Sequence, residues 1–174
     1  IVCVANQKGG VGKTTTASNV AAGLAKAGMQ TLLVDLDPQC NATTGLGGAP
    51  AKTHPLVSEA ALSENVVSTA VTNLSLLPGS RSVRDVERIA EQARAGSMVL
   101  SNHLSCGLNA WDYCLIDCPP SLGELTRTAL AGSTEVLMPI QCEYFALEGL
   151  TQMIEVIRDV MADQPGRLSF SGLV

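Results

Sequence analysis

Aromatic residues are scarce in this sequence, at 3 % of 174 residues, and charged residues make up only 16 %. Charged residues usually account for about 25 % of a globular protein. The shortage of charge excludes a disordered, charge-rich chain. The shortage of aromatic residues leaves alanine, valine, leucine and glycine to build the core. The length predicts a single domain with a sizeable core.

No apolar run approaches the roughly 20 residues that a membrane-spanning helix needs, so we expect no membrane segment. The six cysteines form no CxxC pair, and the two histidines have no metal-ligand spacing. These absences predict buried thiols in a reducing, cytoplasmic setting rather than a disulfide framework or a zinc site. A net charge of −5 excludes a polycation, so contact with nucleic acid would need a local basic patch or residues outside this chain.

The two ends of the sequence both resemble the interior of a protein. The chain begins without methionine, at Ile1, inside an expected strand, and nothing there is typical of a signal peptide. It stops at the end of another expected strand, over 168–174. We therefore expect residues 1–174 to be one domain that is incomplete at both ends, mainly at the C-terminal end.

Apolar runs typical of buried strands alternate with stretches of helical periodicity. This alternation predicts an α/β fold with a mostly parallel sheet and helices on both faces, in which ligands bind at the carboxyl ends of the strands. The expected strands are 1–5, 31–34, 74–77, 113–116, 135–140 and 168–174. The expected helices are 14–27, 56–61, 82–95, 97–109, 122–131 and 146–161, and 38–55 is expected to be mostly loop.

A glycine-rich loop lies between the first expected strand and the first expected helix, over Lys8–Thr15. Glycine allows backbone N–H groups to approach phosphate oxygens, and the following helix N-terminus favours anions. Lys13 can reach the β- and γ-phosphates, the Thr14 hydroxyl can bind Mg²⁺, and Thr15 lies near the α-phosphate. The predicted nucleotide-binding residues are Lys8, Gly9, Gly10, Val11, Gly12, Lys13, Thr14 and Thr15.

Two apolar strands end in carboxylates, a pattern that suits a magnesium site when a phosphate loop is present. Asp117 at the end of 113–116 is predicted to be a metal residue. Asp35 and Asp37 follow 31–34 and are candidates for orienting the attacking water or for supporting the metal. A turn or a helix cap is the alternative role for each of these aspartates.

The phosphate loop departs from the ordinary GxxxxGK[ST] pattern, because Gln7 stands where that pattern has its first glycine. The loop resembles the deviant Walker A motif of the ParA/MinD ATPase superfamily. That resemblance implies that Lys8 reaches across a dimer interface to the nucleotide of the other subunit, in an ATP-sandwich dimer. It also implies that Asp37 activates water, whereas Asp35 supports the Mg²⁺ water shell or a switch region.

Four strings carry a closer resemblance, to the chromosome- and plasmid-partitioning ATPases of the ParA/Soj type. MinD-type relatives usually have glycine at the Gln7 position. Nitrogenase iron proteins place their cluster cysteine elsewhere, so Cys118 is expected to be a packed thiol. The strings are 5–8, 35–47, 117–123 and 139–150.

The resemblance implies a Mg²⁺-dependent ATPase that forms a homodimer on binding ATP and acts as a nucleotide switch in DNA partitioning. It implies a ParB-type partner, non-specific DNA bound through residues outside this chain, no membrane contact, and a cytoplasmic, nucleoid-associated location. The alternatives are a membrane-recruited positioning ATPase of the MinD or flagellar-number type, and a metabolic P-loop phosphotransferase.

The sequence leaves two possible roles for each of two further segments. The stretch 139–150 is part of the dimer surface by resemblance, or simply provides helix-capping residues. The four arginines within 81–94 are interleaved with acidic residues, which favours a solvated helix face over a partner site.

Overall fold

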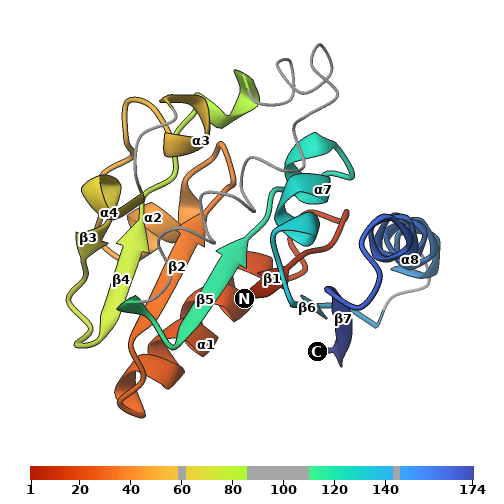
Figure 1. Cartoon of the computed structure of the whole chain (residues 1–174), viewed down its shortest axis with the longest axis horizontal. Helices are drawn as coiled ribbons and strands as arrows, with labels where there is room; N and C mark the ends of the chain where they lie inside the picture. Colours follow the sequence, from red (N-terminus) through yellow and green to blue (C-terminus); the bar gives the residue numbers. More distant parts are fainter. Residues whose placement is uncertain (59–61, 86–109, 143–145) are drawn as a thin grey trace.

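The strands of the described residues form one seven-stranded sheet in the order β3-β4-β2-β5-β1-β6-β7 (Figure 1). The computed structural model describes residues 1–58, 62–85, 110–142 and 146–174. All neighbouring strands are parallel except the short β3–β4 pair. This confirms the predicted α/β class. The strands are β1 (Val2–Val4), β2 (Thr31–Asp35), β3 (Val67–Ser68), β4 (Leu74–Leu77), β5 (Tyr113–Asp117), β6 (Glu135–Met138) and β7 (Ser169–Leu173).

Helices cover both faces of the sheet, and the strand residues alternate between two apolar clusters. Leu33 of β2 packs with the alanines of α1, whereas Leu32 and Val34 pack in the larger cluster that includes residues of α7 and α8. No helix in the described ranges is long and apolar enough to cross a membrane. The helices are α1 (Lys13–Lys26), α2 (Asn41–Gly45), α3 (Pro55–Ser58), α4 (Leu62–Asn65), α7 (Glu124–Ala131) and α8 (Ala146–Asp163).

The structure differs from the predicted elements mainly between β2 and β4. The stretch 38–55, predicted to be mostly loop, contains α2, a single turn of helix whose periodicity is too short to detect. The helix predicted over 56–61 begins at Pro55 as α3, and β3 was not predicted because two exposed residues carry no alternation. The helix predicted over 82–95 lies mostly, and the one over 97–109 wholly, outside the described residues.

The three segments that carry the predicted site follow the carboxyl ends of neighbouring strands in the middle of the sheet. In the strand order, β5 lies between β2 and β1. The parallel register pairs Asp35 with Asp117 and Val4 with Asp117, so the phosphate loop after β1 begins beside both aspartates. The fold therefore brings residues 8–15, 35–37 and 117 together at the carboxyl ends of the central strands.

Candidate nucleotide-binding site

The loop between β1 and α1 turns through glycines in the left-handed region. Gly10 has φ +78° and Gly12, which precedes the first residue of α1, has φ +93°. Both conformations favour glycine over residues with a Cβ atom. No side chain among the described residues caps the helix, so its first N–H groups are available to an anion. The exposed Gln141 side chain donates a hydrogen bond to the Gly10 carbonyl oxygen at 3.2 Å.

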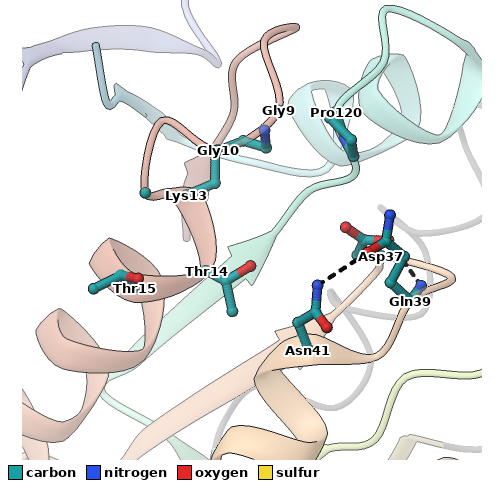
Figure 2. A pocket seen from close by; sticks show the side chains of 10 residues that line it. Gly9, Gly10, Lys13, Thr14, Thr15, Asp37, Gln39, Asn41 and Pro120 are labelled. Atoms are coloured by element: carbon teal, nitrogen blue, oxygen red, sulfur yellow. Dashed lines mark hydrogen bonds between the residues drawn. The ribbon is translucent and has the colours of Figure 1, made fainter. Parts of the chain in front are cut away.

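The loop forms one wall of a pocket of about 270 Å³, and residues after β2 and β5 form the facing wall (Figure 2). Seven predicted site residues line this pocket together. The predicted residues Lys8, Val11, Asp35 and Asp117 are not among the lining side chains, and Val11 is buried. The lining residues are Gly9, Gly10, Gly12, Lys13, Thr14, Thr15, Asp37, Gln39, Asn41 and Pro120.

The Lys13 side chain lies within the loop, with 6 % of its surface exposed. Its Nζ atom donates to the backbone oxygen of Lys8 at 2.8 Å. Burial lowers the pKa of the Lys13 ammonium, and the nearby carboxylate of Asp117 partly offsets that change. The ammonium is therefore held at the pocket by the loop itself.

Asp117, at the end of β5, is fully buried, and neither of its carboxylate oxygens has a hydrogen-bond partner in the described part of the chain. The Thr14 side chain lies beside the carboxylate without reaching hydrogen-bond geometry. Burial raises the pKa of Asp117 to about 7, and this is the largest of several opposing effects. A buried carboxylate with two unused oxygens beside a threonine hydroxyl fits a divalent cation with oxygen ligands.

Asp35 is equally buried, but its carboxylate is fully engaged. Its Oδ2 atom accepts hydrogen bonds from the Thr43 amide at 2.8 Å and the Thr43 hydroxyl at 2.6 Å, while Oδ1 accepts from the Asp37 amide at 3.2 Å. The Thr43 hydroxyl in turn accepts from the Gly79 amide at 2.8 Å. These contacts favour the structural alternative for Asp35, a cap that holds α2 and the end of β4 against β2.

The packing around Asp35 predicts that Gly79→Ala is destabilising. A Cβ atom at Gly79 would lie 2.9 Å from the Asp35 carboxyl group, which its hydrogen bonds hold in place. We expect a loss of about 1–3 kcal/mol in the free energy of unfolding, measured by urea denaturation. The matched control is Gly23→Ala within α1, where the added Cβ meets nothing within 4 Å and should stabilise by about 0.5–1 kcal/mol. Equal stability of the two variants would contradict this description of the site.

Asp37 lines the pocket and is 6 % exposed. Its Oδ1 atom accepts a hydrogen bond from the backbone amide of Gln39 at 2.8 Å, and its backbone oxygen accepts one from the backbone amide of Cys40 at 2.8 Å. Gln39 and Asn41 join the pocket wall through this turn, and the sequence interpretation did not assign them to the site. Their spacing of two and four residues after Asp37, within a polar turn, is the signal that could have identified them.

Cys118 follows Asp117 and lies in the core, where its sulfur is 3.3 Å from that of Cys3. Hydrogen bonding with Cys3 and burial raise the pKa of the Cys118 thiol. The structure thus agrees with the expectation of a packed thiol at this position.

Comparison with known proteins identifies the family of this chain. A family model described as an AAA domain matches residues 1–170. The chain is 46 % identical to the chromosome-partitioning ATPase Soj of Treponema pallidum, with alignment over 97 % of this chain and 67 % of that protein. It is 41 % identical to the sporulation initiation inhibitor protein Soj of Bacillus subtilis, over 100 % of this chain and 71 % of that protein. The chain belongs to the ParA/Soj family of partitioning ATPases.

A solved structure similar to this ParA/Soj chain carries a metabolic name. It is cobyrinic acid a,c-diamide synthase from Mycobacterium smegmatis, with a TM-score of 0.93 and 35 % identity, determined with bound ADP and magnesium and also with an ATP analogue and magnesium. The match covers 99 % of this chain and 72 % of that one. The chain thus spans about two-thirds to three-quarters of the length of these relatives.

Proposed function

We propose that this protein is a Mg²⁺-dependent ATPase whose nucleotide state controls dimer formation in DNA partitioning. The observation that carries the proposal is the buried carboxylate of Asp117 beside Thr14 and Lys13 at a glycine-rich phosphate loop, since neither of its oxygens accepts a hydrogen bond from the described residues. A buried, unpaired carboxylate is costly to the fold, and a bound cation would offset that cost. The higher identity to partitioning proteins supports this role over a metabolic one.

The residues around the pocket divide into phosphate-binding and metal-binding groups. Lys13 would bind the β- and γ-phosphates together with the amides of the loop over 9–12, and Thr15 would lie near the α-phosphate. Thr14 and Asp117 would hold Mg²⁺, directly or through water. When bound, the metal ion supplies charge neutralisation to the phosphate oxygens. Asp35 would act indirectly, because its carboxylate fixes the turn that carries Asp37.

Asp37 would orient the attacking water. It lies on the wall that faces the loop, where the backbone amide of Gln39 fixes its Oδ1 atom, and its carboxylate would hold the water molecule. Gln39 and Asn41 add amide groups to the same wall. Transfer of phosphate to water needs positioning and charge stabilisation rather than a covalent intermediate.

The switch would operate between two copies of the chain. Lys8 would extend from each loop to the nucleotide held by the other subunit, so that ATP stabilises the dimer. The dimer would bind DNA without sequence specificity, through residues that we place outside this chain, and would be nucleoid-associated in the cytoplasm. A ParB-type partner would stimulate hydrolysis and so release the DNA.

The proposal predicts that Asp37→Ala traps the ATP dimer. Loss of the water-orienting carboxylate should lower kcat about a hundredfold or more, while ATP still binds and dimers accumulate. Hydrolysis is measured by phosphate release and dimers by light scattering, with Asp163→Ala at the exposed end of α8 as control. Normal turnover by Asp37→Ala would move the water-orienting role to another residue.

The partitioning role is tested with the natural full-length protein and DNA of random sequence. Binding should require ATP, should persist in Asp37→Ala, and should weaken steeply as the salt concentration rises. Absence of ATP-dependent binding would instead favour a membrane-recruited or metabolic ATPase.

A further inference from the structure

Asn6 lies where the chain leaves the sheet to enter the phosphate loop. The β1–β6 ladder ends with the hydrogen bond from the Ala5 amide to the Leu137 carbonyl oxygen, at 3.2 Å. In a regular parallel ladder the next donor would be the Gln7 amide, two residues on, and the next acceptor Pro139. The Asn6 side chain takes that place, since its Nδ2 atom donates to the Pro139 carbonyl oxygen at 2.7 Å. The backbone of Gln7 is thereby released from the sheet.

The oxygen of the Asn6 side-chain amide contacts Lys8, the first residue of the loop. The Oδ1 atom of Asn6 accepts from the Lys8 backbone amide at 3.0 Å, which closes an Asx turn. The Asn6 side chain is 5 % exposed, and it uses both its oxygen and its nitrogen in these contacts. Because a buried amide is rigid when both of its ends are bonded, Lys8 is fixed relative to the end of β6.

The backbone carbonyl group of Lys8 also accepts a hydrogen bond. Its carbonyl oxygen accepts from Lys13 Nζ at 2.8 Å. A phosphate in the pocket competes for that ammonium, because a charged oxygen is a stronger acceptor than a carbonyl. If bound phosphates displaced Lys13 from this carbonyl oxygen, the Lys8 amide would still donate its hydrogen bond to Asn6.

We propose that Asn6 is a positioning residue that directs Lys8 toward the partner subunit's nucleotide. The inference rests on the proposed role of Lys8 in the ATP dimer. Asn6 does not touch the nucleotide in this account. It fixes the backbone of Lys8 beyond the carboxyl end of β1, and it couples that backbone to Pro139, directly after β6.

Two substitutions separate the two contacts of Asn6. Asn6→Ala removes both, whereas Asn6→Ser keeps a side-chain oxygen that can accept from the Lys8 amide but is too short to reach Pro139. We expect Asn6→Ala to weaken ATP-dependent dimerisation about tenfold or more and Asn6→Ser to restore most of it. ADP affinity of the monomer should stay within about threefold of wild type, because the pocket residues are unchanged. The control is Asn19→Ala on the exposed face of α1, where the Asn19 side chain donates a hydrogen bond to the Thr15 carbonyl oxygen.

Dimerisation is measured by sedimentation with a non-hydrolysable ATP analogue, alongside ADP titration and thermal unfolding. Wild-type dimerisation by Asn6→Ala, in a protein whose Lys8→Ala variant stays monomeric, would overturn the inference and leave the proposed function standing. Equal loss of dimerisation and of ADP affinity in Asn6→Ala, not restored by Asn6→Ser, would also overturn it by showing a general structural role. Wild-type protein that fails to dimerise with the analogue would contradict the proposed function itself.

Discussion

Lys8→Ala should abolish the ATP-dependent dimer and lower ATP hydrolysis on the order of 10³-fold, while the monomer still binds ADP within about threefold of wild-type affinity. The reason is geometric. Lys13 lines the pocket of its own chain, whereas Lys8 is not among the residues that line it. A positive charge that the nucleotide gains only in the dimer stabilises both the dimer and the transition state. Sedimentation and phosphate release measure the two effects.

The control for Lys8→Ala is Lys26→Ala, which removes the same charge at the far end of α1. Lys26→Ala should dimerise and hydrolyse ATP like wild type. A monomeric Lys8→Ala variant with normal turnover would separate hydrolysis from dimerisation. Wild-type dimers in Lys8→Ala would contradict the ATP-sandwich account.

Asp117→Asn should have two opposite effects, a large loss of activity and a gain in stability. Hydrolysis that depends on Mg²⁺ should fall on the order of 10³-fold, because the buried oxygens that fit the cation are reduced to one neutral oxygen. The nucleotide-free variant should be more stable than wild type at pH 8, because the substitution removes a buried carboxylate that has no hydrogen-bond partner among the residues the structure describes.

The stability effect has a defined pH dependence. The folded-state pKa of Asp117 is about 7, above the ordinary value of 3.8. The folded state therefore holds a proton that the unfolded state releases, and wild-type stability falls as the pH rises from about 4 to about 7. Burial of the charge then costs on the order of 2–4 kcal/mol at pH 8. Asp117→Asn should thus raise Tm by several degrees at pH 8 and change it little at pH 4. A Tm difference independent of pH would contradict the raised pKa.

The sequence was sufficient to predict the alternation of strands and helices, because the central strands are buried apolar runs with clear boundaries. It also predicted the six loop residues that line the pocket, since glycines and lysines at fixed offsets have few other uses, although Lys8 and Val11, predicted with them, do not line it. The predicted strand 31–34 and helix 146–161 differ from β2 and α8 by only one or two residues at the C-terminal end. Those elements carry strong periodicity, which depends little on tertiary contacts.

The rest depends on contacts between segments far apart in the chain. The spacing of Asp35 and Asp37 left both as candidates for the same chemistry, and only the Thr43 hydrogen bonds favour a structural role for Asp35. Gln39 and Asn41 enter the pocket because a turn after Asp37 directs them there. The role inferred for Asn6 depends on its hydrogen bond to Pro139, which is 133 residues away in the sequence. Local patterns carry no information about such pairs.

The central claim is that Lys8 acts on the nucleotide of the other subunit, and mixing two inactive variants tests it most directly. In a mixed dimer of Lys8→Ala and Lys13→Ala, the site of the Lys8→Ala subunit keeps its own Lys13 and receives Lys8 from its partner. Random pairing of equal amounts should therefore restore about a quarter of wild-type ATP hydrolysis. If Lys8 acted within its own subunit, every site in the mixture would lack one lysine, and hydrolysis would stay at the level of the separate variants.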